Sequence, residues 1–369
     1  MKRLIALTAL GALLFAVGST WVHLELPDPS GPHAVGRLER VWLDLARPES
    51  HTVEDSDHRQ VGVLVWYPAA KRSGVPAPYI PNEDETIGAL AASGEVNPVA
   101  AYGLRWVRNH AFQDAAIDPS QSKYPVVLLS PGNATNVEFY GSIAEDLASN
   151  GYIVVGVNHS YQVPATQLMN GEVALFREDL GVPAKIEERT HDLRFVIDRL
   201  EEEVESGALL EGRIDLDAVG VMGHSNGGLT AVELCKDDQR VQACLNIDGQ
   251  AAGGALGTSP DDQVPAQPFM FLTKEVGLHP ELTSRFEAGR TGGYRVVIPA
   301  ATHDGFADGA LFAPSLWPFA RTADKVNEVT RGFVNAFFDL ALKGEPGSVL
   351  GGVRAPTDVF VYVYPLERA

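Results

Sequence analysis

The segment from Gly223 to Gly227 carries the clearest chemical signal in the sequence, because it reads G-H-S-N-G, with a serine between two glycines. A serine hydroxyl becomes a useful nucleophile only when the backbone holds it in place and a base accepts its proton. The G-x-S-x-G pattern is typical of a sharp turn between a buried strand and a helix, where glycines avoid clashes. The strand is predicted over residues 217–222 and the helix over residues 229–235. We therefore predict that Ser225 is a catalytic nucleophile.

A nucleophilic serine needs a histidine base, which follows it in the chain when the serine sits on a turn of this kind. His279 and His303 are the only histidines after Ser225. His303 lies in the loop that follows the predicted strand of residues 294–298, where the chain returns to the edge of the sheet. His279 lacks a clear strand before it, so the sequence favours His303 as the base.

An acidic side chain should orient the imidazole and stabilise its charged form. Asp248 ends the first predicted strand after the nucleophile helix, and Glu275 lies just past the next strand. Asp304 is adjacent to His303 in the sequence and is therefore too close to orient its ring. Chain order alone leaves the choice between Asp248 and Glu275 open.

Two backbone N–H groups should bind the negative charge that develops on the carbonyl oxygen of the substrate. One is the N–H of Asn226, directly after the serine, and the other should come from the loop after an earlier strand. The loop that follows the apolar run of residues 125–130 fills that place. Pro131 has no N–H, so the later Asn133 is the predicted donor.

Predicted strands and helices alternate along the chain, which is typical of an α/β fold with a mainly parallel central sheet and helices on both faces. Ligands in such sheets bind beyond the carboxyl ends of the strands. The predicted strands are residues 61–67, 125–130, 152–157, 217–222, 241–247, 269–273 and 294–298. The predicted helices are residues 138–149, 185–204, 229–235 and 326–342. Residues 69–123 and 249–267 lack clear periodicity and are predicted to be lid-like insertions or surface loops.

Composition and charge narrow the classes of partner. The 369 residues are 45% hydrophobic and contain neither an internal repeat nor a linker that would divide the chain, so residues 23–369 are predicted to form a single catalytic domain. The formal net charge of −19 disfavours nucleic acid and anionic membrane surfaces as partners.

The first 22 residues are predicted to be a signal peptide or an N-terminal anchor. Lys2 and Arg3 precede an apolar run over residues 4–17, and small residues allow cleavage after Gly18. Apolar character continues to Val22, which is the argument for an anchor. We expect an exported protein, periplasmic or secreted, with no membrane span in the mature chain if the segment is cleaved.

Cys235 and Cys244 are the only cysteines. They lie across a predicted helix end and the next strand start, so they form a disulfide or are two small buried side chains. Neither belongs to a cluster with zinc-binding spacing, and we predict no metal and no cofactor.

The sequence resembles the platelet-activating-factor acetylhydrolase family of α/β-hydrolases, of the single-chain, lipase-like kind. Five blocks in conserved order carry the resemblance, and they are similar to the family patterns G-P-[YF]-x-V-G, the oxyanion block with D-L-A-S-x-G-[FY], G-H-S-F-G-G, E-D-Q-R…L-D and H-x-x-F-A-D. In this chain they are residues 31–36 (GPHAVG), 129–152 (LSPGNATNVEFYGSIAEDLASNGY), 222–228 (MGHSNGG), 237–240 (DDQR) with 246–248 (NID), and 303–308 (HDGFAD).

The resemblance implies a catalytic triad of Ser225, Asp248 and His303 without a metal, and it favours Asp248 over Glu275. Two positions depart from the family pattern. Pro131 replaces the family's histidine and Asn226 replaces its phenylalanine. Both changes keep the backbone donors and alter the shape and polarity of the acyl pocket.

We therefore expect a serine esterase that acts on small-molecule or lipid esters with short acyl chains, such as short-acyl or oxidised phospholipids like platelet-activating factor. The alternatives are a polyester hydrolase, an amide or acyl-peptide hydrolase, and a non-catalytic binding protein on a hydrolase scaffold. An aromatic cluster after His303 walls the acyl pocket or packs under a loop. Its members are Phe306, Phe312, Trp317 and Phe319.

Overall fold

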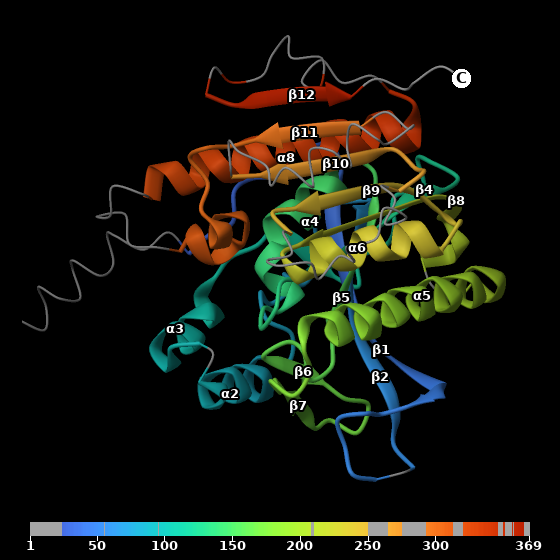
Figure 1. Ribbon diagram of the computed structural model, residues 1–369, viewed down its shortest axis with the longest axis vertical. Helices are drawn as coiled ribbons and strands as arrows, with labels where there is room; N and C mark the ends of the chain where they lie inside the picture. The colour runs from blue at the N-terminus through green and yellow to red at the C-terminus, as the bar shows by residue number, and fades with distance from the viewer. Residues whose placement is uncertain are drawn as a thin grey trace, which may run out of the picture.

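The central strands form a parallel sheet because their sequences are continuous apolar runs that are buried on both faces. The computed structural model describes residues 24–54, 56–94, 96–207, 210–249, 265–274, 293–312, 320–345, 350, 356 and 358–364. These residues form a ten-stranded sheet in the order β12-β11-β10-β9-β8-β4-β5-β2-β1-β3, and β6 and β7 pair separately (Figure 1). Neighbouring strands from β5 through β4, β8, β9 and β10 to β11 are parallel.

The strands of the sheet are β1 (Ala34–Pro48), β2 (His58–Ala69), β3 (Ala111–Gln113), β4 (Tyr124–Ser130), β5 (Ile153–His159), β8 (Ile214–His224), β9 (Val241–Ile247), β10 (Phe269–Thr273), β11 (Gly293–Val297) and β12 (Phe360–Tyr364). The separate pair is β6 (Ala165–Gln167) and β7 (Val173–Leu175). The α-helices are α2 (Glu83–Ser93), α3 (Pro98–Gly103), α4 (Gly141–Ser149), α5 (Val182–Ser206), α6 (Asn226–Asp237) and α8 (Ala320–Lys343). Short 3₁₀ helices are η1 (Leu104–Trp106), η2 (Val137–Tyr140), η3 (Leu210–Gly212), η4 (His303–Phe306) and η5 (Asp308–Ala310).

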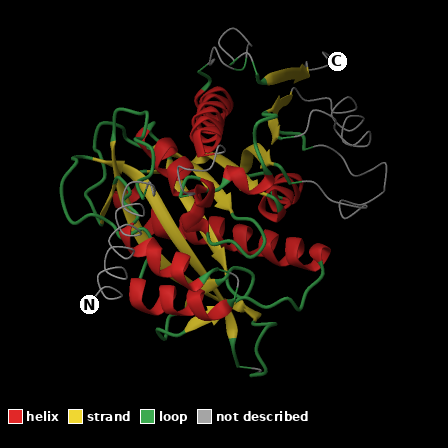
Figure 2. Ribbon diagram, turned by 90° about the vertical axis from the view of Figure 1, so that its left-hand side faces the viewer, coloured by secondary structure: helices red, strands yellow, loops and turns green. Residues whose placement is uncertain are grey.

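Helices cover both faces of the sheet, and Figure 2 shows them on either side of the strands. Successive side chains of a strand point to opposite faces. Val127 and Leu129 of β4 therefore pack in a core cluster with α4 and α8. Val126 and Leu128 pack in a second cluster with α5 and α6. This arrangement confirms the predicted α/β-hydrolase fold.

Each predicted strand and helix is present, with ends that shift by at most three residues, except that α8 begins at Ala320, well before the predicted residue 326. The first turn of the helix predicted over residues 138–149 is the 3₁₀ helix η2. The larger unpredicted elements are β1, β12, the β6–β7 pair and the contents of residues 69–123, where α2 and α3 form a third apolar cluster that contains Ile87, Leu90 and Ala101. The short 3₁₀ helices η3, η4 and η5 were not predicted either. In the described part of the chain, no helix combines the length and apolar character needed to cross a membrane.

Candidate active site

Ser225 occupies a strained turn between β8 and α6. Its backbone has φ 55° and ψ −121°, a conformation that costs free energy for any residue other than glycine. Two backbone bonds hold it there, since the Ser225 N–H donates to the Ile247 carbonyl at 2.9 Å and the Leu229 N–H donates to the Ser225 carbonyl at 3.2 Å. The turn thus directs the serine side chain out beyond the carboxyl end of β8.

The two glycines of the motif are required by close backbone approach. A Cβ on Gly223 would lie 2.2 Å from the Gly227 carbonyl oxygen. A Cβ on Gly227 would lie 2.0 Å from the Ser130 carbonyl oxygen at the end of β4. The start of α6 is therefore packed directly against the segment that follows β4.

His303 lies between Ser225 and Asp248. Its Nε2 is 2.9 Å from the Ser225 hydroxyl oxygen, and its Nδ1 is 2.7 Å from Oδ2 of Asp248. An ionised carboxylate can only accept hydrogen bonds, so Nδ1 carries the proton and Nε2 accepts the hydrogen bond from the serine hydroxyl. This is the arrangement in which a histidine can accept the serine proton.

Asp248 is buried, and its charge is stabilised by hydrogen bonds. Burial by itself would raise the pKa of Asp248, but hydrogen bonds from His303 and Thr273 outweigh it and hold the pKa below the ordinary value. Thr273 donates to Oδ1 at 2.8 Å. The same contact with Asp248 raises the pKa of His303 above its ordinary value, against the effect of desolvation.

The structure brings Asp248 to His303, as the resemblance implied. Asp304 is exposed and lies beside His303 in η4. Glu275 and His279 lie outside the described residues.

The loop after β4 lies beside the serine turn, because Ser130 pairs with Gly223 across the two parallel strands. The Gly132 N–H donates to the Tyr140 hydroxyl at 3.1 Å and is therefore occupied. Asn133 and Asn226 are half-buried, and no residue in the described ranges accepts a hydrogen bond from the N–H of either one. Both N–H groups are thus available to a substrate oxygen.

His224 and Tyr140 contact the site and were missed by the sequence reasoning. The Tyr140 hydroxyl donates to Nδ1 of His224 at 2.8 Å, and the His224 ring lies 4.6 Å from that of His303, centroid to centroid. Desolvation, and then the nearby His303, lowers the pKa of His224 to about 3. His224 is therefore neutral near pH 7 and places no positive charge beside His303. A histidine within the G-x-S-x-G pattern was the available signal.

Two of the aromatic residues predicted as a pocket wall, Phe306 and Phe312, lie in the described part of the chain and pack against core clusters. Phe306 is buried in the core cluster with α8, and its ring lies 6.0 Å from that of His224. Phe312 contacts the Tyr79 ring edge-on at 5.6 Å. Trp317 and Phe319 lie outside the described residues. Their role as a pocket wall stays a prediction.

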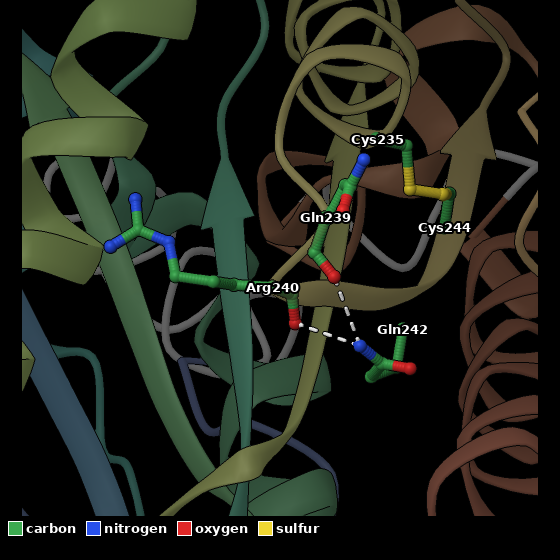
Figure 3. Close-up of a disulfide and its surroundings, with 5 residues drawn as sticks. All are labelled: Cys235, Gln239, Arg240, Gln242 and Cys244. Carbon is green, nitrogen blue, oxygen red and sulfur yellow. Dashed lines mark hydrogen bonds between the residues drawn. A yellow bond between two sulfur atoms is a disulfide. The ribbon is translucent and has the colours of Figure 1, made fainter.

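A disulfide joins Cys235 near the end of α6 to Cys244 in β9, across a Cα–Cα distance of 6.3 Å (Figure 3). Of the two alternatives left open by the sequence, the structure has the bridge. From the start of β9, the side-chain amide of Gln242 donates to the Gln239 and Arg240 carbonyls of the preceding turn at 3.1 and 3.3 Å (Figure 3). The bridge ties the helix that follows Ser225 to the strand that ends at Asp248. Across the residues that the structure describes, no group of three or more His, Cys, Asp or Glu side chains is placed to hold a metal ion.

Comparison with known proteins identifies relatives of this chain. The family model described as platelet-activating factor acetylhydrolase, isoform II, matches residues 19–171. A probable 1-alkyl-2-acetylglycerophosphocholine esterase of Arthroderma benhamiae is 23% identical over 260 residues, which are 66% of this chain and 64% of the relative. Platelet-activating factor acetylhydrolase of Cavia porcellus is 25% identical over 285 residues, which are 69% of this chain and 61% of the relative. The chain is thus similar to the platelet-activating factor acetylhydrolase family.

The match spans slightly less than two thirds of the length of those two relatives. A solved structure that resembles this chain over more of its length is a ferulic acid esterase from Streptomyces cinnamoneus. It is 29% identical, has a TM-score of 0.73, and the match covers 91% of this chain and 98% of the esterase. An esterase with the same architecture over nearly its whole length supports the fold assignment.

Proposed function

We propose that this protein is a serine ester hydrolase that acts through an acyl-enzyme on esters with short acyl groups. The observation that carries the proposal is the chain of contacts from Ser225 through His303 to Asp248, at 2.9 and 2.7 Å, on a strained turn at a strand end. A surface turn would not need that strained backbone or the buried carboxylate behind it.

The reaction follows from the geometry. His303 accepts the Ser225 proton as the serine oxygen attacks the ester carbonyl, and Asp248 holds the imidazole tautomer and stabilises the imidazolium. The N–H groups of Asn226 and Asn133 bind the oxyanion. His303 then gives its proton to the leaving alcohol, and the acyl-enzyme forms. Water hydrolyses the acyl-enzyme with His303 as the base again.

The names of the relatives support two substrate classes. The name platelet-activating factor acetylhydrolase supports short-acyl phospholipids like platelet-activating factor as substrates of this chain, and the name ferulic acid esterase supports small esters of an aromatic acid. The match to the ferulic acid esterase covers nearly the whole of both chains, and for this reason we keep small aromatic-acid esters as a second substrate class. Pro131 and Asn226 depart from the acetylhydrolase pattern on both sides of the oxyanion position and alter the acyl pocket.

A fluorophosphonate probe and a series of p-nitrophenyl esters test the proposal. We expect covalent labelling at Ser225, and we expect Ser225→Ala to lose labelling and about 10³-fold or more of turnover. Parallel assays with a short-acyl phospholipid and with methyl ferulate distinguish the two substrate classes. Full activity in folded Ser225→Ala would contradict the serine mechanism.

We also propose that the protein is exported, with residues 1–22 as a signal peptide or an anchor. The basic start and apolar run of that segment support this, and so does the Cys235–Cys244 bridge, because disulfides persist in oxidising compartments. Mass spectrometry of the protein from its native cells would find a chain that starts at Ser19 after cleavage, or an intact N-terminus in the membrane fraction if it is an anchor. An intact, reduced protein in the cytoplasm would contradict export.

A further inference from the structure

One face of α5 is polar yet buried. Lys185, Arg189 and Asp192 are spaced four and three residues apart, which places them on one side of the helix. Their exposed fractions are 2%, 0% and 0%. Charged side chains are rarely buried unless a partner requires them, so the groups that this face contacts need an explanation.

The buried face of α5 contacts the three consecutive residues 131–133. Arg189 Nη1 donates to the Pro131 carbonyl at 2.6 Å, and its Nη2 donates to the Gly132 carbonyl at 3.4 Å. Lys185 Nζ donates to the side-chain oxygen of Asn133 at 3.1 Å. Side chains of one helix therefore bind each residue from Pro131 to Asn133.

Asp192 reaches Ser130, which directly precedes these residues, through a histidine. Its Oδ2 accepts from Nδ1 of His159 at 2.9 Å, and Nε2 of His159 lies 3.0 Å from the Ser130 hydroxyl. Burial lowers the pKa of His159 to about 4, so the imidazole between Asp192 and Ser130 is neutral near pH 7.

The contact with Arg189 orients the proposed oxyanion donor. A trans peptide is planar, and its C=O and N–H point in opposite directions. Arg189 holds the carbonyl of the Gly132–Asn133 peptide, which directs the Asn133 N–H away from α5. The preceding peptide is held at both ends, because its carbonyl accepts from Arg189 and its N–H donates to Tyr140. Asn133 is then the first N–H of the loop that is free for substrate.

Arg189 holds this loop with a charge that no acid balances directly. Within the described ranges, no carboxylate lies at salt-bridge distance from Arg189, and its other bonds go to Gln162, at 2.7 Å to the side chain and 3.2 Å to the carbonyl. Burial lowers the pKa of Arg189 to about 10, so the guanidinium remains charged near pH 7. A buried cation adds little to stability compared with a well-packed apolar side chain.

We propose that Arg189 is a positioning residue for ester hydrolysis. It fixes the Pro131–Asn133 loop so that the Asn133 N–H donates to the oxyanion. The inference rests on the proposed function. Arg189 does not touch the substrate and acts through the peptide that it holds. Its removal should therefore weaken transition-state binding more than substrate binding.

The test compares Arg189→Met and Arg189→Lys with the wild-type protein, and uses Arg199→Met as a matched control. Arg199 lies on the same helix and pairs with Glu202 and Glu203 away from the loop. We expect kcat on a soluble p-nitrophenyl ester to fall about 100-fold in Arg189→Met and about 10-fold in Arg189→Lys, with KM within a few-fold. Arg199→Met should retain wild-type kcat and KM.

A second readout separates positioning from general damage. Affinity for an alkyl boronic acid, which adds to the serine as a transition-state analogue, should weaken in proportion to kcat/KM. Affinity for the product carboxylate should change little. A fall in both affinities by the same factor would indicate a distorted pocket and would overturn the positioning role.

The two proposals fail in different ways. If the wild-type protein is not labelled by fluorophosphonate and Ser225→Ala keeps its activity, the proposed function is wrong. If wild-type labels, Ser225→Ala is inactive and folded Arg189→Met keeps kcat within two-fold, only the inference about Arg189 is overturned. Should Arg189→Met fail to fold, Arg189→Lys decides, and wild-type kcat in that variant overturns the inference.

Discussion

Replacing Gly227 with alanine tests how closely the serine turn must approach the oxyanion loop. The added Cβ would lie 2.0 Å from the Ser130 carbonyl oxygen and 2.5 Å from that of Pro131. Both are backbone atoms, so no side-chain rotation relieves the contact. Gly227 is a residue of α6 without a positive φ, and alanine suits that helical conformation. The substitution therefore perturbs the approach of α6 to β4 and little else.

The size of the effect follows from this contact. Real Cβ atoms essentially never come within 3.0 Å of such an atom, so α6 and the end of β4 must move apart by about 1 Å. A displacement of about 1 Å between reacting groups can cost about 10²-fold in rate. Overpacking costs about 1–3 kcal/mol, and the better helix propensity of alanine returns up to about 1 kcal/mol. We expect a large loss of kcat/KM with a small loss of stability.

The assay is kcat/KM on a soluble ester together with the free energy of unfolding in urea. Gly332→Ala is the matched control, because Gly332 lies within α8 and nothing lies within 4 Å of its added Cβ. That variant should keep full activity and gain about 0.5–1 kcal/mol. Folded Gly227→Ala with activity within two-fold of wild type would refute the reasoning.

Three further predictions concern the acid, the base and the disulfide. Asp248→Asn should lower kcat/KM by roughly 10⁴-fold because an amide favours the wrong imidazole tautomer, whereas Glu275→Gln should stay within a few-fold on the same ester. The opposite ranking would transfer the acid role to Glu275. Only neutral His303 can accept a proton, and Asp248 raises its pKa above the ordinary 6.5, so the acid limb of kcat/KM should have its midpoint above pH 6.5 and move to lower pH in Asp248→Asn. A pH profile with the wild-type midpoint below 6.5 would argue against this contact. Replacing Cys235 and Cys244 together with alanine should destabilise the protein by about 2.5 kcal/mol, as expected for so short a loop, and an unchanged urea midpoint would contradict a structural bridge.

The sequence predicts the centre of this fold well because buried parallel strands are written as continuous apolar runs. The predicted strands of residues 241–247 and 269–273 have the same bounds as β9 and β10. The serine turn is predictable for a related reason, since a backbone contact as close as that of Gly227 leaves glycine as the only fitting residue. Here local sequence and tertiary packing impose the same requirement.

The margins of the fold were missed because their pattern depends on partners far along the chain. β1 is half-exposed along its second half, and buried charges at Arg37 and Asp44 interrupt its apolar alternation. β12 is mostly exposed and, among the strands that the structure describes, pairs with β11 alone. In each case pairing with another strand, rather than a strong local pattern, defines the element.

The buried polar face of α5, next to the site, was also missed by the sequence prediction. Its apolar periodicity predicts the helix correctly, but periodicity reports which positions are apolar and leaves open whether the polar positions meet water. Arg189 lies more than 50 residues from the carbonyls that it holds, so its sequence neighbours carry no sign of that role.

The end of β4 explains why a buried charge is useful there. The strand ladder stops at Ser130, and the carbonyls of the buried residues Pro131 and Gly132 have no strand partner. Buried carbonyls must be satisfied, and one guanidinium has enough donors to satisfy both. The same bonds leave the opposite side of the loop free to bind an oxyanion. A site built at strand ends therefore creates a need for buried donors, and in this protein the need is met from the helix behind the loop.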